Sequence, residues 1–221
     1  IGGNAFPLRE RLMGIDRLKK ILAVSGLSKA KRDEIIDRMK AGYIEWSEDA
    51  FPGFLPNIVS GRIANRFDFG GINYTVDGAC AGSLCAVKQS IHELHDHHCD
   101  IALTGGVNVS NDPLSYLSFS KTPALSLKNQ IRPYDQHADG MLLGDGIGML
   151  VLKRLEDAEK AGDRIYAVIK GIGSSSDGRA KSIYAPRLKG QINAINRAYA
   201  CAGASPEDIG LIEGHGTGTV V

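Results

Sequence analysis

Residues 76–84 read Val-Asp-Gly-Ala-Cys-Ala-Gly-Ser-Leu and join a strand-like run to a long amphipathic helix. The strand-like run ends in Tyr74–Val76. After the corner, apolar residues recur at the spacing of one helix face: Cys80, Leu84, Val87, Ile91 and Leu94. The pattern predicts a strand, a tight corner of small residues and a buried helix whose first turn carries Cys80.

Cys80 is a candidate nucleophile because of this position. The unpaired N–H groups and the positive end of the macrodipole at a helix N-terminus favour a thiolate over a thiol. Small neighbours would let a substrate backbone or thioester approach: Gly78, Ala79, Ala81 and Gly82. The alternative interpretation is a small buried residue that fills a helix–sheet junction.

A second candidate site lies near the end of the sequence. Residues 213–219 read Glu-Gly-His-Gly-Thr-Gly-Thr and follow an apolar run, 209–212, that is predicted to be a strand. Glycine-rich loops after strands are where α/β proteins place catalytic groups. His215 lies between two glycines, with hydroxyls at Thr217 and Thr219, so this loop is predicted to meet a ligand.

Four motifs stand in an order that resembles the β-ketoacyl synthases, the condensing enzymes of fatty-acid and polyketide synthesis. They are the cysteine corner, residues 100–109 (Asp-Ile-Ala-Leu-Thr-Gly-Gly-Val-Asn-Val), residues 132–140 with 144–148, and residues 215–219. Three further stretches are most similar to the ketosynthases of polyunsaturated-fatty-acid synthases: residues 64–67, 119–125 and 181–186.

The resemblance implies a thiolase-like α/β fold with αβαβα layers, incomplete in this sequence. Residues 1–156 would form the N-terminal half, which carries the nucleophilic cysteine. Residues 157–221 would begin the C-terminal half, which carries the first catalytic histidine. Both ends of the sequence look cut, and most of the second half is expected to lie beyond Val221.

The reaction that the resemblance implies is a decarboxylative Claisen condensation. Cys80 would accept an acyl group from the phosphopantetheine of an acyl carrier protein, and His215 would donate a hydrogen bond to the malonyl thioester. Thr217 and Thr219 would contact the pantetheine arm. No directly bound cofactor and no metal are implied. The expected partners are a carrier domain, adjoining acyltransferase and reductase domains, and a second copy in a homodimer.

The family also uses a second histidine, in an Asn-x-Gly-His motif, and a lysine, both expected beyond Val221. We therefore expect these 221 residues alone to be inactive. Gly214 stands where many relatives have alanine. Two alternatives remain open: a thiolase, which activates its second substrate by proton abstraction, and a catalytically silent ketosynthase-like partner. Such partners typically lack the nucleophile.

The composition of the chain indicates which binding partners and which cellular compartment to expect. The 221 residues are 43% hydrophobic and 23% charged with a net charge of +1, which favours neither nucleic-acid binding nor an anionic membrane surface. No run approaches the roughly 20 apolar residues of a membrane span. Four cysteines without disulfide spacing favour a reducing, cytoplasmic compartment. The histidine-rich run 92–98 is interpreted as a solvated helix end rather than a metal site.

Residues 144–148, Gly-Asp-Gly-Ile-Gly, do not favour a nucleotide site, because a strand-like run rather than a helix follows them. The alternation of elements predicts an α/β fold with a largely parallel sheet. Helices are predicted over 7–24, 28–39, 57–67, 156–161 and 188–202, and strands over 74–76, 100–107, 147–152, 165–172 and 209–212.

Overall fold

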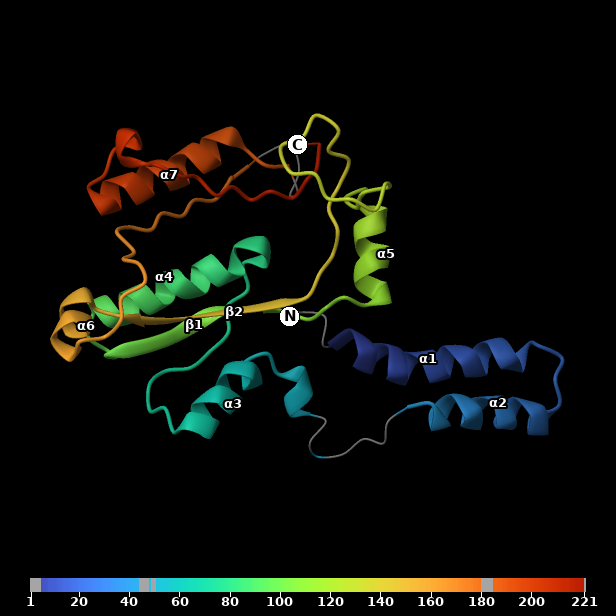
Figure 1. Ribbon diagram of the computed structural model, residues 1–221. Helices are drawn as coiled ribbons and strands as arrows, with labels where there is room; N and C mark the ends of the chain where they lie inside the picture. The colour runs from blue at the N-terminus through green and yellow to red at the C-terminus, as the bar shows by residue number, and fades with distance from the viewer. Residues whose placement is uncertain (1–4, 44–47, 49–50, 180–184, 221) are drawn as a thin grey trace. The chain divides into compact units, whose positions relative to one another are not determined.

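The computed structural model describes residues 5–43, 48, 51–179 and 185–220 (Figure 1). The chain divides into two compact units, Ile1–Gly82 and Ser83–Val221, and each is considered by itself. Most of the 181–186 stretch noted above lies outside the described residues.

The first unit is helical. Its elements are α1 (Ala5–Ala23), α2 (Lys29–Ala41), the 3₁₀ turn η3 (Pro52–Phe54), α3 (Ile58–Phe67) and the 3₁₀ turn η4 (Ala79–Ala81). The Ser28 hydroxyl caps α2 by accepting a hydrogen bond of 3.3 Å from the Lys31 amide. The three helices predicted here are confirmed. The strand predicted at 74–76 is wrong, since these residues belong to no strand.

The second unit contains α4 (Gly82–His95), which begins at the unit boundary, and then β1 (Ile101–Asn108), α5 (Pro113–Lys121), β2 (Gly146–Lys153), α6 (Leu155–Ala161), α7 (Leu188–Ala202) and the 3₁₀ turn η5 (Pro206–Asp208). The predicted helices at 156–161 and 188–202 and the predicted strands at 100–107 and 147–152 are confirmed. Gly203 ends α7 in the left-handed conformation, with φ of 61°.

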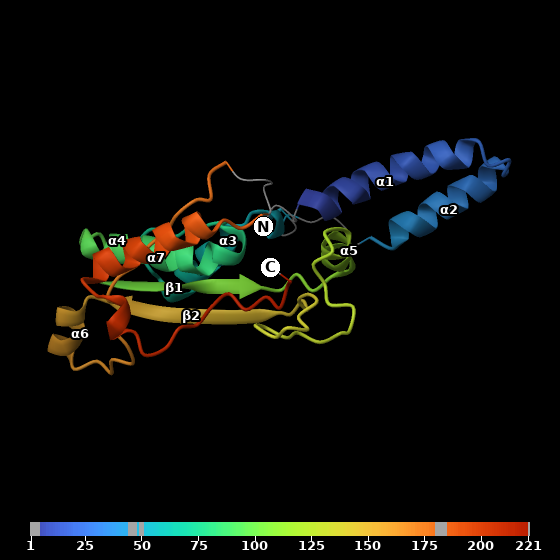
Figure 2. The same ribbon diagram turned by 90° about the horizontal axis from the view of Figure 1, so that it is seen from above.

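The sheet in the described residues has two strands, and they are antiparallel (Figure 2). The register runs from Ile101 opposite Lys153 to Asn108 opposite Gly146. The prediction of a largely parallel sheet is therefore wrong for these strands. Gly105 is required by the pairing, because a β-carbon there would collide with the Gly148 carbonyl and lie 2.8 Å from the Met149 sulfur.

The strands predicted at 165–172 and 209–212 are also wrong, since neither segment joins a ladder. Residues 171–173 instead lie against α7. A β-carbon on Gly171 would come within 2.6 Å of the Ala202 nitrogen, and one on Gly173 would collide with the Ala198 nitrogen. Extended apolar segments need a neighbouring backbone to become strands, and at residues 171–173 the neighbour is a helix.

The buried core of the second unit forms where α4 meets β1. Val87 and Leu94 of α4 are buried, as is Thr104 of β1. Leu84 was predicted on the same buried face, but its side chain is 65% exposed, so that part of the prediction is wrong. The first turn of α4 is covered less than the rest of the helix.

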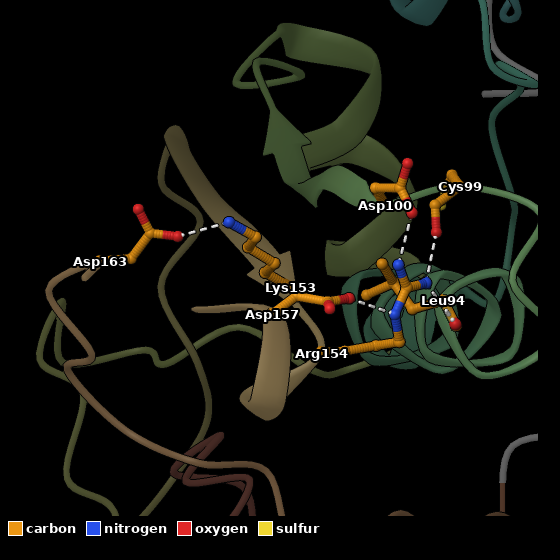
Figure 3. A network of polar contacts seen from close by, with 7 residues as sticks. All are labelled: Leu94, Cys99, Asp100, Lys153, Arg154, Asp157 and Asp163. Carbon is orange, nitrogen blue, oxygen red and sulfur yellow. Dashed lines mark hydrogen bonds and ion pairs between the residues drawn. The ribbon is translucent and has the colours of Figure 1, made fainter. Parts of the chain in front are cut away.

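Arg154 ties three elements of this unit together (Figure 3). Its guanidinium donates to the carbonyls of Leu94 (2.9 Å) and Cys99 (2.7 Å), at the end of α4 and in the turn before β1. It also donates to the carboxylates of Asp100 (2.5 Å) and Asp157 (2.6 Å). The hydrogen bond from Arg154 lowers the pKa of Asp157. One forked side chain thus holds the start of β1 against α4 and α6.

Among the described residues, no helix combines the length and apolar character needed to cross a membrane. In the same part of the chain, no three or more His, Cys, Asp or Glu side chains gather in a way that could hold a metal ion.

Candidate active site

Cys80 lies in η4, the 3₁₀ turn that runs directly into α4. Asp77 holds the corner, because its carboxylate accepts a hydrogen bond of 3.0 Å from the Ala79 amide. Ala79 has φ of 48°, a left-handed conformation that marks how tightly the chain turns. Cys80 is exposed, whereas the alternative interpretation was a small buried residue that fills a helix–sheet junction. An exposed thiol at the start of a helix is accessible to a thioester and does not serve as core packing.

The other three cysteines differ from Cys80 in place or burial. All four thiols are free; Cys85 and Cys99 are half-buried and Cys201 is exposed. Burial raises the pKa of the Cys99 thiol, and the charge of Glu93 adds to this. A raised pKa leaves less thiolate at neutral pH, so Cys99 is a poor competitor for acylation.

His215 lies in a loop that turns through two left-handed glycines, Gly216 (φ 61°) and Gly218 (φ 70°). His215 is exposed, and Thr217 and Thr219 are half-buried. The hydroxyl oxygens of these threonines are 2.9 Å apart and share one hydrogen bond. Two hydroxyls that share one hydrogen bond leave one O–H free to donate elsewhere. The loop thus offers an imidazole and a donor hydroxyl close together in the chain.

The segment between α5 and β2 supports this loop. In Figure 1 the segment passes beside the C-terminal residues. The Gly140 amide donates to the Gly218 carbonyl at 2.9 Å. A β-carbon on Gly218 would be 3.0 Å from the Gly140 oxygen, and one on Gly216 would be 3.7 Å from the Pro133 ring. Tyr134 approaches Gly214 still more closely. The 132–140 motif is therefore the support of the His215 loop.

Local hydrogen bonds hold the supporting segment in place. The Ser126 hydroxyl donates to Asp139 at 2.8 Å and lowers the pKa of that carboxyl group. The His137 amide donates to Asp135 at 2.7 Å and likewise lowers the pKa of Asp135. Arg132 places its Nε out of contact with solvent and without a hydrogen-bond partner in the described structure.

The predicted site residues are thus distributed between the units. Cys80 belongs to the first unit, and His215, Thr217 and Thr219 belong to one loop of the second. The sequence motifs contained the supporting segment 132–140 but gave no sign that it contacts the His215 loop. Only the glycines at 214, 216 and 218 hinted at a close approach by another segment.

Comparison with known proteins identifies relatives across most of the chain. The family model for the β-ketoacyl synthase N-terminal domain matches residues 13–158, and that for the C-terminal domain matches residues 166–221. A polyunsaturated fatty acid synthase polypeptide of Thraustochytrium sp. is 46% identical over 202 residues, which are 91% of this chain and 7% of that protein. Polyketide synthase PksN of Bacillus subtilis is 42% identical over 164 residues, 74% of this chain and 3% of that protein.

Solved structures of ketosynthases are also similar to this chain. The oxazolomycin ketosynthase domain of Streptomyces albus has a TM-score of 0.72 at 36% identity, and the ketosynthase from module 6 of the bacillaene synthase of Bacillus subtilis has 0.72 at 38%. Each match covers 74% of this chain and 29% of the solved chain. The likeness confirms the predicted thiolase-like α/β fold, of which this chain contains a part.

Proposed function

This chain belongs to the β-ketoacyl synthase family, and we propose that it carries the acyl-accepting cysteine and one catalytic histidine of a condensing enzyme. The proposed reaction is the decarboxylative condensation of a malonyl thioester with a cysteine-bound acyl chain, in polyunsaturated fatty acid or polyketide synthesis. The observation that carries this proposal is the exposed Cys80 in the turn that opens α4. We also propose that residues 1–156 and 157–221 belong to the two halves of the thiolase-like fold.

In the first step, the Cys80 thiolate attacks the carbonyl carbon of an acyl thioester on a carrier protein. The new carbon–sulfur bond forms as the pantetheine thiolate leaves and takes up a proton. Backbone amides near Cys80, at the turn into α4, are the proposed donors for the oxyanion of the tetrahedral intermediate. The small residues around Cys80 leave room for the thioester to reach the thiol.

In the second step, a malonyl thioester loses carbon dioxide, and the electron pair of the broken bond moves into an enolate. A ring N–H of His215 donates to the thioester oxygen as its charge grows. The enolate carbon attacks the acyl–Cys80 carbonyl, the carbon–carbon bond forms, and the Cys80 thiolate leaves. The free O–H of the Thr217–Thr219 pair donates to the pantetheine arm.

The proposed partners follow from this chemistry. Both substrates arrive on the phosphopantetheine of an acyl carrier protein, so no cofactor is bound directly. Acyltransferase and reductase domains would supply the malonyl group and process the β-keto product. We place the protein in the cytoplasm, where cysteines stay reduced.

Carbon dioxide release separates the proposal from its alternatives. The whole product of the gene that encodes this chain is incubated with a malonyl thioester and an acyl thioester. We expect a β-ketoacyl product and one carbon dioxide for each carbon–carbon bond formed. Product made from two non-carboxylated thioesters without carbon dioxide would identify a thiolase. Absence of both acylation and product would identify a silent partner.

We further propose a homodimer in which sheet edges meet across a two-fold axis. β1 pairs with β2 along one edge, and its other edge has no strand partner in the described residues. An unpaired apolar strand edge tends to associate with another strand. Light scattering of the whole gene product at micromolar concentration should give twice the monomer mass, and a stable monomer would contradict the proposal.

A further inference from the structure

Gly106 of β1 lies directly against the first turn of α4. A β-carbon on Gly106 would be 2.8 Å from the Ser83 β-carbon and 3.7 Å from the Ser83 α-carbon. Carbon atoms in ordinary contact are about 3.5–4.0 Å apart, so the shorter distance is a collision. The Ser83 β-carbon is bonded to the backbone, and rotation of the side chain does not move it. The strand and the helix turn therefore lie this close because residue 106 has no β-carbon.

The rest of α4 packs on the same face of β1. Thr104 is two residues before Gly106, so both lie on one face of the strand. Ser83, Val87 and Leu94 have the spacing of one helix face. Thr104, Val87 and Leu94 are buried, and both ribbon views show α4 running beside β1 (Figures 1 and 2). The contact between Gly106 and Ser83 is thus one end of a helix–strand interface.

This end of the interface is next to Cys80 in the chain. η4 ends at Ala81 and α4 begins at Gly82, so no loop separates the thiol from the helix. The Gly82 amide donates to the Ala79 carbonyl across Cys80. A shift of the first turn of α4 is therefore passed to Cys80 through a continuous, hydrogen-bonded turn.

We propose that Gly106 is a positioning residue for Cys80, because its missing β-carbon lets the first turn of α4 rest on β1 and this contact sets the place of the thiol. The proposal rests on the role given to Cys80 above. A larger side chain at residue 106 pushes that turn away from the strand. A displacement of about 1 Å at a catalytic group can cost about 10²-fold in rate, so the substitution slows the attack of Cys80 on an acyl thioester.

Matched variants of the whole gene product test this contact. Gly106→Ala introduces the collision with Ser83. Gly148→Ala is the control, because Gly148 pairs with Gly106 and a β-carbon there would have no atom of the described residues within 4 Å beyond its chain neighbours. Adding Ser83→Gly to Gly106→Ala removes the colliding β-carbon, whereas adding Ser83→Ala keeps it. Ser83→Gly alone completes the comparison.

Single-turnover acylation of Cys80 by an acyl thioester is measured for each variant. We expect Gly106→Ala to lower the maximal rate about tenfold or more, while the KM for the thioester changes by less than about threefold. Ser83→Gly should restore most of the lost rate, Ser83→Ala should restore none, and Gly148→Ala should react like the unchanged protein. A merely structural role would lower the amount of folded protein, which thermal unfolding reports, and would leave the rate per folded molecule unchanged.

The rate at which iodoacetamide alkylates Cys80 gives a readout that needs no acyl substrate. We expect Gly106→Ala to change this rate by at least about threefold relative to Gly148→Ala, and Ser83→Gly in the same chain should return it. The proposal is overturned if Gly106→Ala acylates like Gly148→Ala, or if the two double variants recover equally. If the unchanged protein is not acylated at all, the proposed function fails, and the alkylation rates still decide whether Gly106 positions Cys80.

Discussion

Replacing Cys80 by alanine is expected to abolish acylation of the protein by acyl thioesters and to lower condensation by at least about 10³-fold. The reason is that the acyl chain has to be held covalently while the enolate attacks it. Without the thiol there is no acyl-enzyme for the enolate to reach. The measurement is the mass of the intact protein after incubation with an acyl thioester, followed by the yield of β-ketoacyl product.

Cys201→Ala is the matched control for this substitution, because Cys201 is exposed like Cys80 but lies at the end of α7. It should acylate and condense at the unchanged rate. Cys80→Ser is a second test. A hydroxyl is a much weaker nucleophile than a thiolate at neutral pH, so acylation of this variant should also be lower. Full acylation of Cys80→Ala would show that the nucleophile lies elsewhere.

Replacing His215 by alanine is expected to lower decarboxylative condensation by about 10²–10³-fold, the usual effect of removing one oxyanion donor. Acylation of Cys80 should change little, because the proposed donors of that step are the backbone amides near Cys80. His215→Gln should recover part of the loss, since its amide N–H can donate to the thioester oxygen. Single-turnover assays of each step measure the two effects separately.

His98→Ala is the control for His215. His98 is an exposed histidine that follows the C-terminal end of α4, and its ring is 3.2 Å from the Glu93 carboxylate. Its loss should leave both steps unchanged. Equal loss of acylation and condensation in His215→Ala would contradict the assignment, because it would point to a damaged fold or to a role in both steps.

The helices of this protein were predictable from sequence because their signals are local. Ser28 caps α2 through its own side chain, and Gly203 ends α7 in the left-handed conformation. Strands depend on partners far away in the chain. Residues 147–152 and 165–172 are both apolar runs, yet the first pairs with β1, while the end of the second lies against α7 at Gly171. The apolar pattern also does not indicate the relative direction of paired strands, so the antiparallel pairing of β1 and β2 was not predicted.

The candidate site, too, could be predicted only where its sequence signals are local. Cys80 and His215 were identified from short motifs, because a small-residue corner before a helix and a glycine-flanked histidine are local patterns. The exposure of Leu84 was predicted wrongly, because it depends on what packs over the start of α4. The approach of Tyr134 to Gly214 was missed because it joins segments distant in sequence.

Cys80 is expected to be the residue that accepts the acyl group. The most direct measurement is to incubate the whole gene product with an acyl thioester, digest it, and map the adduct by peptide mass. We expect fragment ions to place the acyl group on Cys80 and not on Cys85, which lies nearby in the sequence, and we expect none on the peptides that contain Cys99 or Cys201. An acyl group on any of those three, with none on Cys80, would contradict it.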